Sequence, residues 1–159
     1  MATAKDIRQM SYSDFVEFEK SSPAKHEWVN GAVYAMAGGT LEHARLQAAV
    51  SRLLGIGLAG RPCAVFSSDL RVRSANTKFS SYPDLSVVCG KAQTLPDDPN
   101  SVLNPIVIVE ILSEGTEAYD RGEKFAHYRH IESLQEYLLV SQREPRIELF
   151  RKEGAGWML

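Results

Sequence analysis

The stretch that decides the fold is Pro105-Ile106-Val107-Ile108-Val109-Glu110-Ile111-Leu112, residues 105–112. A continuous apolar run of this length predicts a strand that is buried on both faces in the middle of a sheet. Glu110 interrupts the run, and a buried carboxylate is costly unless it is paired or bound to a cation. The stretch therefore predicts a central strand and marks Glu110 as a candidate site residue, although a structural ion pair with an arginine would also explain a single buried glutamate.

A second carboxylate opens another apolar run, in which Asp84 follows Pro83 and precedes residues 85–89. Alone, Asp84 could be a turn or cap residue. Two carboxylates brought together at the ends of neighbouring strands repel each other unless one is protonated or a cation lies between them. Mg²⁺ commonly takes one or two carboxylates, with waters and substrate phosphate oxygens as its other ligands. Asp84 and Glu110 therefore form a candidate metal site, and the backbone carbonyl of Ile111 is a candidate third ligand.

Lys124 is the third candidate, and it lies one turn into the helix expected after Glu110. An ammonium group there could orient an attacking water or neutralise charge that develops on a phosphoryl group. Most helical lysines are simply solvated, and Arg121 is a local competitor for the same role. Tyr128 is one turn beyond Lys124 on the same helix face, where it could support the lysine or pack in the core.

The rest of the chain carries clear local signals. Ser11 or Ser13 begins the first helix, with Ser13 a good N-cap. Asn30-Gly31 between two apolar runs predicts a tight hairpin, and Thr40 caps a long second helix. Asp120 and Glu123 form a capping box for the third helix. The expected helices cover residues 14–20, 41–58 and 120–133, and the expected strands cover 63–73, 82–89, 105–112, 135–141 and 146–152. This order predicts the α/β (α+β mixed) class, with one mixed β-sheet flanked by helices.

Composition narrows the cellular context. The chain has 159 residues and a net charge of −2, which is the size of one domain without a global basic field. Cys63 and Cys89 lie in apolar strands, so two reduced core thiols are expected. No apolar run is long enough to span a membrane and the N-terminus lacks a secretory signal, so we expect a cytoplasmic protein. The basic span that includes Arg61, Arg71, Arg73 and Lys78 is either solvated surface or a contact for phosphates.

These motifs together resemble a known family. Tyr82-Pro83-Asp84, then an apolar strand that ends Val109-Glu110-Ile111-Leu112-Ser113, then Asp120, Lys124 and Tyr128 are similar to the motifs of the PD-(D/E)XK nuclease superfamily. The likeness is closer to its Uma-type branch of restriction endonucleases. It extends upstream to residues 26–31, which contain Glu27, to His43 in the second helix, and to residues 68–72, which contain Asp69. In total the resemblance covers residues 11 to 150 in the right order.

The resemblance implies a restriction-endonuclease-like core, a mixed β-sheet flanked by helices, with an N-terminal helix and β-hairpin. It implies Mg²⁺ or Mn²⁺ held by Asp84 and Glu110, with Glu27 as a further acidic member. The lysine of the simple E-x-K pattern would fall at Leu112, whereas the Uma-type branch carries it on the helix, at Lys124. Residues 1–159 are expected to form a single domain. Family members run longer, and the strand that begins at Trp157 has the form of one cut short.

Two functions remain after this comparison. The first is a metal-dependent endonuclease that hydrolyses phosphodiester bonds of DNA, with a homodimer as the natural way to present two sites to two strands. The second is a catalytically weak or inactive nuclease fold that acts as a nucleic-acid-binding or interaction module, which the acidic net charge favours. Other enzyme classes lack their motifs: no G-x-S-x-G elbow and no phosphate-binding G-x-G-x-x-G loop is present. His127 and His130 are expected to be surface or packing residues.

Overall fold

The computed structural model describes residues 8–159. Its helices are α1 (Tyr12–Ser21), α2 (Leu41–Gly57), α3 (Glu117–Arg121) and α4 (Glu123–Tyr128), with a 3₁₀ turn η1 (Ala75–Thr77). Its strands are β1 (Arg8–Gln9), β2 (His26–Val29), β3 (Ala32–Ala35), β4 (Cys63–Phe66), β5 (Arg71–Ser74), β6 (Phe79–Ser81), β7 (Leu85–Cys89), β8 (Ser101–Val102), β9 (Val107–Ile111), β10 (Glu136–Val140), β11 (Ile147–Glu153) and β12 (Gly156–Met158).

Over residues 8–159 these strands form two sheets instead of the single sheet expected. Sheet A has the order β1-β3-β2-β6-β5-β8, and sheet B has the order β12-β11-β10-β9-β7-β4. Each is mixed, with a parallel pair β5–β8 in sheet A and β9–β10 in sheet B. The strand expected over residues 63–73 is in fact two strands. A turn in which the Leu70 N–H donates to the Ser67 carbonyl sends β4 into sheet B and β5 into sheet A.

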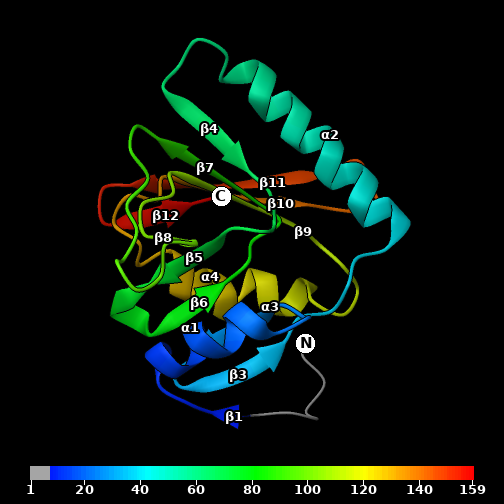
Figure 1. Ribbon diagram of the computed structural model, residues 1–159. Coiled ribbons are helices and arrows are strands. Elements are labelled where there is room, and N and C mark those ends of the chain that lie inside the picture. The colour runs from blue at the N-terminus through cyan, green and yellow to red at the C-terminus, as the bar shows by residue number, and fades with distance from the viewer. Residues whose placement is uncertain (1–7) are drawn as a thin grey trace.

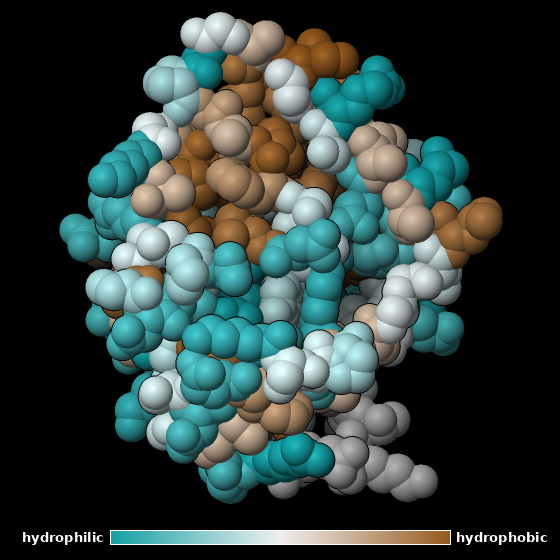
Figure 2. Space-filling view, viewed as in Figure 1, coloured by the Kyte–Doolittle hydropathy of each residue, from teal (hydrophilic) through white to brown (hydrophobic). Residues whose placement is uncertain are grey.

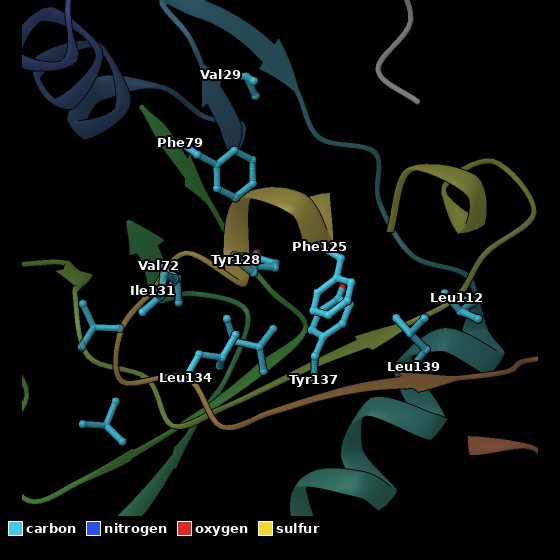
Figure 3. Packing of buried hydrophobic residues seen from close by; sticks show 13 residues of the cluster. Val29, Val72, Phe79, Leu112, Phe125, Tyr128, Ile131, Leu134, Tyr137 and Leu139 are labelled. Atoms are coloured by element: carbon cyan, nitrogen blue, oxygen red, sulfur yellow. The ribbon is translucent and has the colours of Figure 1, made fainter. Parts of the chain in front are cut away.

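Strand β9 lies inside sheet B, between β7 and β10, so the prediction of a central strand is confirmed. One face of β9 meets α4, which lies between the two sheets, and α2 lies on the other side of sheet B (Figure 1). The main core fills the space around α4. Its side chains come from both sheets, and the Phe125 and Tyr137 rings stack at 4.7 Å (Figure 3). This core fixes α4 over the end of β9, where the candidate site lies.

The N-terminal segments follow their local signals with one correction. Asn30 and Gly31 both have positive φ, and Val29 pairs with Ala32, so the predicted two-residue hairpin is confirmed. The N-cap of α1 is Ser11 and not Ser13, because the Ser11 hydroxyl accepts the N–H of Asp14. Thr40 caps α2 in the same way, as expected.

The third expected helix differs from its prediction. Residues 117–128 form two short helices that meet at Gly122, whose backbone leaves helical geometry at φ −107° and ψ −94°. Asp120 lies within α3 and is buried, so it does not cap the following helix, and the capping box with Glu123 is wrong. The break turns α4 so that Lys124 is buried.

The two cysteines form a disulfide, which corrects the expectation of free thiols. Cys63 in β4 and Cys89 in β7 are directly paired across the antiparallel ladder, with their Cα atoms 3.9 Å apart. Two cysteines 26 positions apart give no sequence signal for this pairing. It follows from the register of β4 against β7, which brings the two side chains to the same face of sheet B.

Strand β5 corrects the expectation for the basic span. Arg71 is 5% exposed and forms an ion pair with buried Asp98, so it is neither solvated surface nor a contact for DNA phosphates. The guanidinium of Arg73 lies 3.3 Å from the ring centroid of Tyr12. Both arginines face α1 because Val72 between them points into the main core. Across residues 8–159, no helix combines the length and apolar character that crossing a membrane requires.

Candidate active site

The two predicted carboxylates lie side by side at the ends of β7 and β9. Leu85 pairs with Val109 in the antiparallel ladder, which places Asp84 opposite Glu110. The Ile111 N–H donates to Asp84 Oδ2 at 2.7 Å, and the Asp84 N–H donates to Glu110 Oε2 at 3.4 Å. Each acid is therefore held by the backbone of the other strand, and sequence positions 26 residues apart become one site.

Lys124 reaches this site from α4. Its Nζ lies 2.8 Å from Glu110 Oε1, 3.5 Å from Glu27 Oε1 and 3.6 Å from Asp120 Oδ1. Leu112, where the simple E-x-K pattern would place the lysine, is instead buried in the core between sheet B and α4. The structure thus brings Lys124 to Glu110 from a different element, as the resemblance implied.

Glu27 and two tyrosines complete the wall around the lysine. Glu27 Oε1 accepts the Ser81 hydroxyl at 2.5 Å, and its Oε2 accepts the Tyr119 hydroxyl at 2.9 Å. The Tyr128 hydroxyl donates to Glu110 Oε1 at 3.3 Å, while its ring belongs to the main core (Figure 3). Tyr128 therefore both packs and supports the site.

The pKa values of Glu110, Asp120 and Lys124 are all raised, through burial and neighbouring charges. Burial raises the pKa of Glu110 well above its usual range, against the stabilising charge of Lys124. Burial also raises the pKa of Asp120. Burial by itself would lower the pKa of Lys124, but the carboxylates around it, led by Glu110, raise that pKa well above its usual range. The ammonium is therefore retained, and it faces more carboxyl groups than one positive charge could balance with all of them ionised.

These residues line a pocket of about 170 Å³ between β9, α3 and the loop that leads into α2. Its charged lining comprises four carboxylates, Glu27, Asp84, Glu110 and Asp120, with Lys124 and His43 as the basic groups. With His43 neutral, the lining has a formal excess of three negative charges. In the described part of the chain no three His, Cys, Asp or Glu side chains converge as metal ligands. Two carboxylate ligands suit Mg²⁺ or Mn²⁺, which keep waters and substrate oxygens as further ligands.

Helix α2 contributes two contacts to Asp84. His43 Nε2 lies 3.1 Å from Asp84 Oδ1, and the hydrogen bond to this carboxylate raises the pKa of His43. Gln47, one turn later, donates from Nε2 to the Asp84 carbonyl at 2.8 Å. His43 was expected near the site from the resemblance, whereas nothing in the sequence pointed to Gln47.

A second buried polar network adjoins the pocket through Tyr82. The Tyr82 hydroxyl donates to Glu19 Oε1 at 2.9 Å and accepts from Arg71 Nη1 at 3.1 Å. Burial raises the pKa of Tyr82 to about 12, so its hydroxyl remains protonated. Arg71 in turn pairs with Asp98, which also accepts the Tyr12 hydroxyl. The residue two positions before Asp84 is therefore fixed to α1 and β5.

Several candidates lie away from the pocket. Asp69 is on the surface, with its side chain 84% exposed and paired with Lys25, so the structure does not bring it to the other site residues. Arg121 binds Glu117 and Glu148 and does not compete with Lys124. His127 stacks on Phe79 at 4.5 Å and has the expected packing role.

Sequence reasoning missed Ser81, Tyr119 and Gln47. Each is a common residue type outside any motif, and each reaches the site only through pairing with a distant carboxylate or carbonyl. The hydroxyl of Tyr119 is shielded enough that burial raises its pKa. No periodicity or spacing signal could have selected these three residues.

A family model and two curated relatives match most of this chain. The model of the Uma2 family, described as "Putative restriction endonuclease", matches residues 12–159. The Synechocystis sp. protein slr1290 is 37% identical over 155 residues, which are 95% of this chain and 79% of that relative. A second Synechocystis sp. protein, sll1609, is 32% identical over 151 residues, 94% of this chain and 85% of the relative. Both relatives are described as uncharacterized.

A solved structure supports the same fold. A protein from Anabaena variabilis, described as a "putative nuclease belonging to DUF820", superposes with a TM-score of 0.64. The match covers 86% of this chain and 84% of that chain at 17% identity. At that identity the likeness concerns the fold, and the expected mixed α+β, restriction-endonuclease-like architecture is confirmed.

Proposed function

The chain belongs to the Uma2 family of restriction-endonuclease-like proteins, and from that premise we propose that it is a metal-dependent endonuclease acting on DNA. The observation that carries the proposal is the convergence of Asp84, Glu110 and Lys124 in one over-acidic pocket. Buried carboxylates are costly to keep without compensation. The pocket offers Lys124 as the one buried ammonium among the described residues that line it, which leaves a divalent cation as the natural complement.

Mg²⁺ or Mn²⁺ would be held by Asp84 and Glu110, with the backbone carbonyl of Ile111, a residue that lines the pocket, as the candidate third ligand. When bound, such an ion polarises a phosphoryl oxygen and lowers the pKa of a bound water. The donor set fits this ion because both carboxylates are hard oxygen ligands at one end of the pocket. Ile111 is already fixed through its own N–H, which donates to Asp84.

Lys124 supplies positive charge next to the reacting phosphate. Its ammonium is retained at neutral pH because its pKa is raised by the carboxylates, led by Glu110. A group of this kind stabilises negative charge that develops on a phosphoryl group and can orient a water for attack. Glu27 and Asp120 also contact the ammonium, and Tyr128 restrains the Glu110 carboxylate by donating to Oε1.

His43 adds a second basic group to the lining of the pocket. Its ring is partly exposed and contacts Asp84 through Nε2, and the hydrogen bond to Asp84 raises its pKa. A protonated His43 therefore adds positive charge to the pocket that would receive the substrate phosphate. A homodimer, if formed, would present two such pockets to the two strands of a duplex.

The test is plasmid nicking in Mg²⁺, in Mn²⁺ and in EDTA. Asp84→Asn and Glu110→Gln should each abolish cleavage while circular dichroism shows a retained fold. Asp69→Asn is the matched control, because it makes the same chemical change at an exposed acid outside the pocket. Cleavage that survives both site substitutions, or that persists in EDTA, would refute the assignment.

A second candidate function is a nucleic-acid-binding or interaction module without useful catalysis. It is favoured by the net charge of −2 and by the position of the lysine, which lies on helix α4 and not at residue 112 of the simple E-x-K pattern. This function predicts DNA binding that is unaffected by EDTA and by Asp84→Asn. Filter binding with Mg²⁺ and with EDTA, run beside the nicking assay, separates the two functions, because phosphate contacts give salt-dependent DNA binding with or without catalysis whereas only the endonuclease cuts DNA.

A further inference from the structure

Helix α2 is anchored weakly by packing. Although it has 17 residues and every one is described, none of its side chains is buried. Its inward residues Leu46, Val50 and Leu54 are only partly covered by sheet B. Figure 2 shows apolar side chains gathered in a hollow between α2 and the strands β4 and β7. Apolar packing alone therefore holds this helix less firmly than α4 is held.

The N-terminal half of α2 is instead tied to Asp84. His43 and Gln47 are four residues apart, so they share the helix face that meets the start of β7. His43 contacts the carboxylate of Asp84, and Gln47 donates to its backbone carbonyl at 2.8 Å. The same helix therefore contacts both the side chain and the backbone carbonyl of Asp84.

The Asp84 carbonyl lies where the sheet cannot supply a partner. Strand β4 ends at Phe66, which is paired with Ser86, so β4 stops before it reaches Asp84. On the opposite side, the Asp84 N–H is directed at the Glu110 carboxylate. The main chain of Asp84 is thus fixed by two side chains, Glu110 on its N–H and Gln47 on its carbonyl, and not by a strand ladder.

From this geometry we infer that Gln47 is a positioning residue of the active site, which orients Asp84 for metal binding through the Asp84 carbonyl. The inference rests on the proposed function only in taking Asp84 as a metal ligand. Residues that hydrogen-bond to a metal ligand without binding the metal themselves typically change metal affinity or activity by about 10–100-fold when they are replaced. Gln47 should act in the same way, because the peptide that it holds carries the ligating side chain.

The experiment compares Gln47→Met with the wild type and with Arg45→Ala. Methionine matches glutamine in length and helix propensity but donates no hydrogen bond. Arg45 is on the same helix, is exposed, and bonds only to Glu42 among the described residues, so it is the matched control. Mn²⁺ affinity is measured by electron paramagnetic resonance, and amide exchange of Ile111, which donates to Asp84 Oδ2, is measured by NMR in metal-free protein.

Gln47→Met should weaken Mn²⁺ binding about 10-fold and speed exchange of the Ile111 amide, while Arg45→Ala and the thermal midpoint of both variants stay near wild type. In DNA cleavage, kcat should fall more than KM rises. Unchanged Mn²⁺ affinity and unchanged Ile111 exchange in Gln47→Met would overturn the inference. A wild type that binds Mn²⁺ but cuts no DNA would refute the endonuclease and leave this inference to the affinity comparison, whereas a wild type without Mn²⁺ affinity would refute both.

Discussion

Replacing Lys124 with methionine should destabilise the metal-free protein strongly. The substitution keeps the length of the side chain and removes the ammonium that lies 2.8, 3.5 and 3.6 Å from Glu110, Glu27 and Asp120. All four residues are buried, so water in the pocket compensates only in part for the lost partner. The three carboxylates would then face one another in a small pocket with no buried cation between them.

The size of the destabilisation by Lys124→Met follows from the burial of the ion pair. Removing one partner of a buried ion pair costs about 3–5 kcal/mol. At about 2–4 °C per kcal/mol for a chain of this size, the unfolding midpoint should fall by roughly 6–20 °C. The carboxyls can reduce the cost by taking up a proton. In the folded variant their pKa values then lie further above the unfolded values, so the destabilisation should grow with pH, by up to about 1.4 kcal/mol per pH unit for each proton retained.

The assay is thermal unfolding followed by circular dichroism in EDTA at several pH values, and again with Mg²⁺. Lys152→Met is the matched control, because among residues 8–159 that lysine side chain bonds only a backbone carbonyl at the surface, and its loss should cost under about 0.5 kcal/mol. Mg²⁺ should stabilise Lys124→Met more than the wild type, since the emptied pocket is more acidic. The double variant Lys124→Met/Glu110→Gln should be more stable than Lys124→Met alone. Midpoints for Lys124→Met that match Lys152→Met at every pH would show that the ammonium does not balance the buried acids.

Three further outcomes follow from the same geometry. Cys63→Ser with Cys89→Ser should lower the free energy of unfolding by about 3–4 kcal/mol, because the disulfide closes a loop of 26 residues; urea unfolding of wild type with reductant should match the variant. Because the pKa of Glu110 is raised on folding, the stability of the metal-free protein should fall as the pH rises from the unfolded pKa near 4.5 to the folded pKa. Glu110→Gln should flatten this dependence of stability on pH, measured by urea unfolding at several pH values. An unchanged pH dependence would contradict the raised pKa. Arg71→Met should cost about 3–5 kcal/mol by leaving buried Asp98 unpaired, and Arg71→Met/Asp98→Asn should recover part of it; equal losses in both variants would show that the ion pair is not the cause.

Local features of the sequence were sufficient for the elements that carry the site. A run of eight residues is apolar except for Glu110, and only a strand inside a sheet buries such a run on both faces. Asn30 and Gly31 accept positive φ, which fixed the hairpin, and a threonine hydroxyl at Thr40 fixed the start of α2. The spacing of Lys124 and Tyr128 placed them on one helix face, where both contact Glu110. The roles of these residues in catalysis stay predictions.

Local sequence patterns did not predict the features that depend on contacts between distant segments. Residues 63–73 contain no glycine or proline, and the polar residues 67–69 do not show by themselves that β4 and β5 belong to different sheets. Arginine is usually a surface residue, and Arg71 is buried because Asp98, in a separate loop, forms an ion pair with it. Asp120 has the spacing of a cap, yet it lies inside α3 because the helix breaks at Gly122 instead.

The sequence by itself determined the strands β7 and β9 and the helix α2 beside the site, and which acids and lysine are chemically unusual, since those properties depend on neighbours within a few positions. Only the tertiary structure decided how these residues meet. The register of β7 against β9 sets Asp84 beside Glu110, and the packing of α4 delivers Lys124. The packing of α2 beside sheet B likewise puts Gln47 on the Asp84 carbonyl, and the pairing of β4 with β7 joins Cys63 to Cys89. Each pairing depends on the free energy of the whole core, which no local pattern encodes.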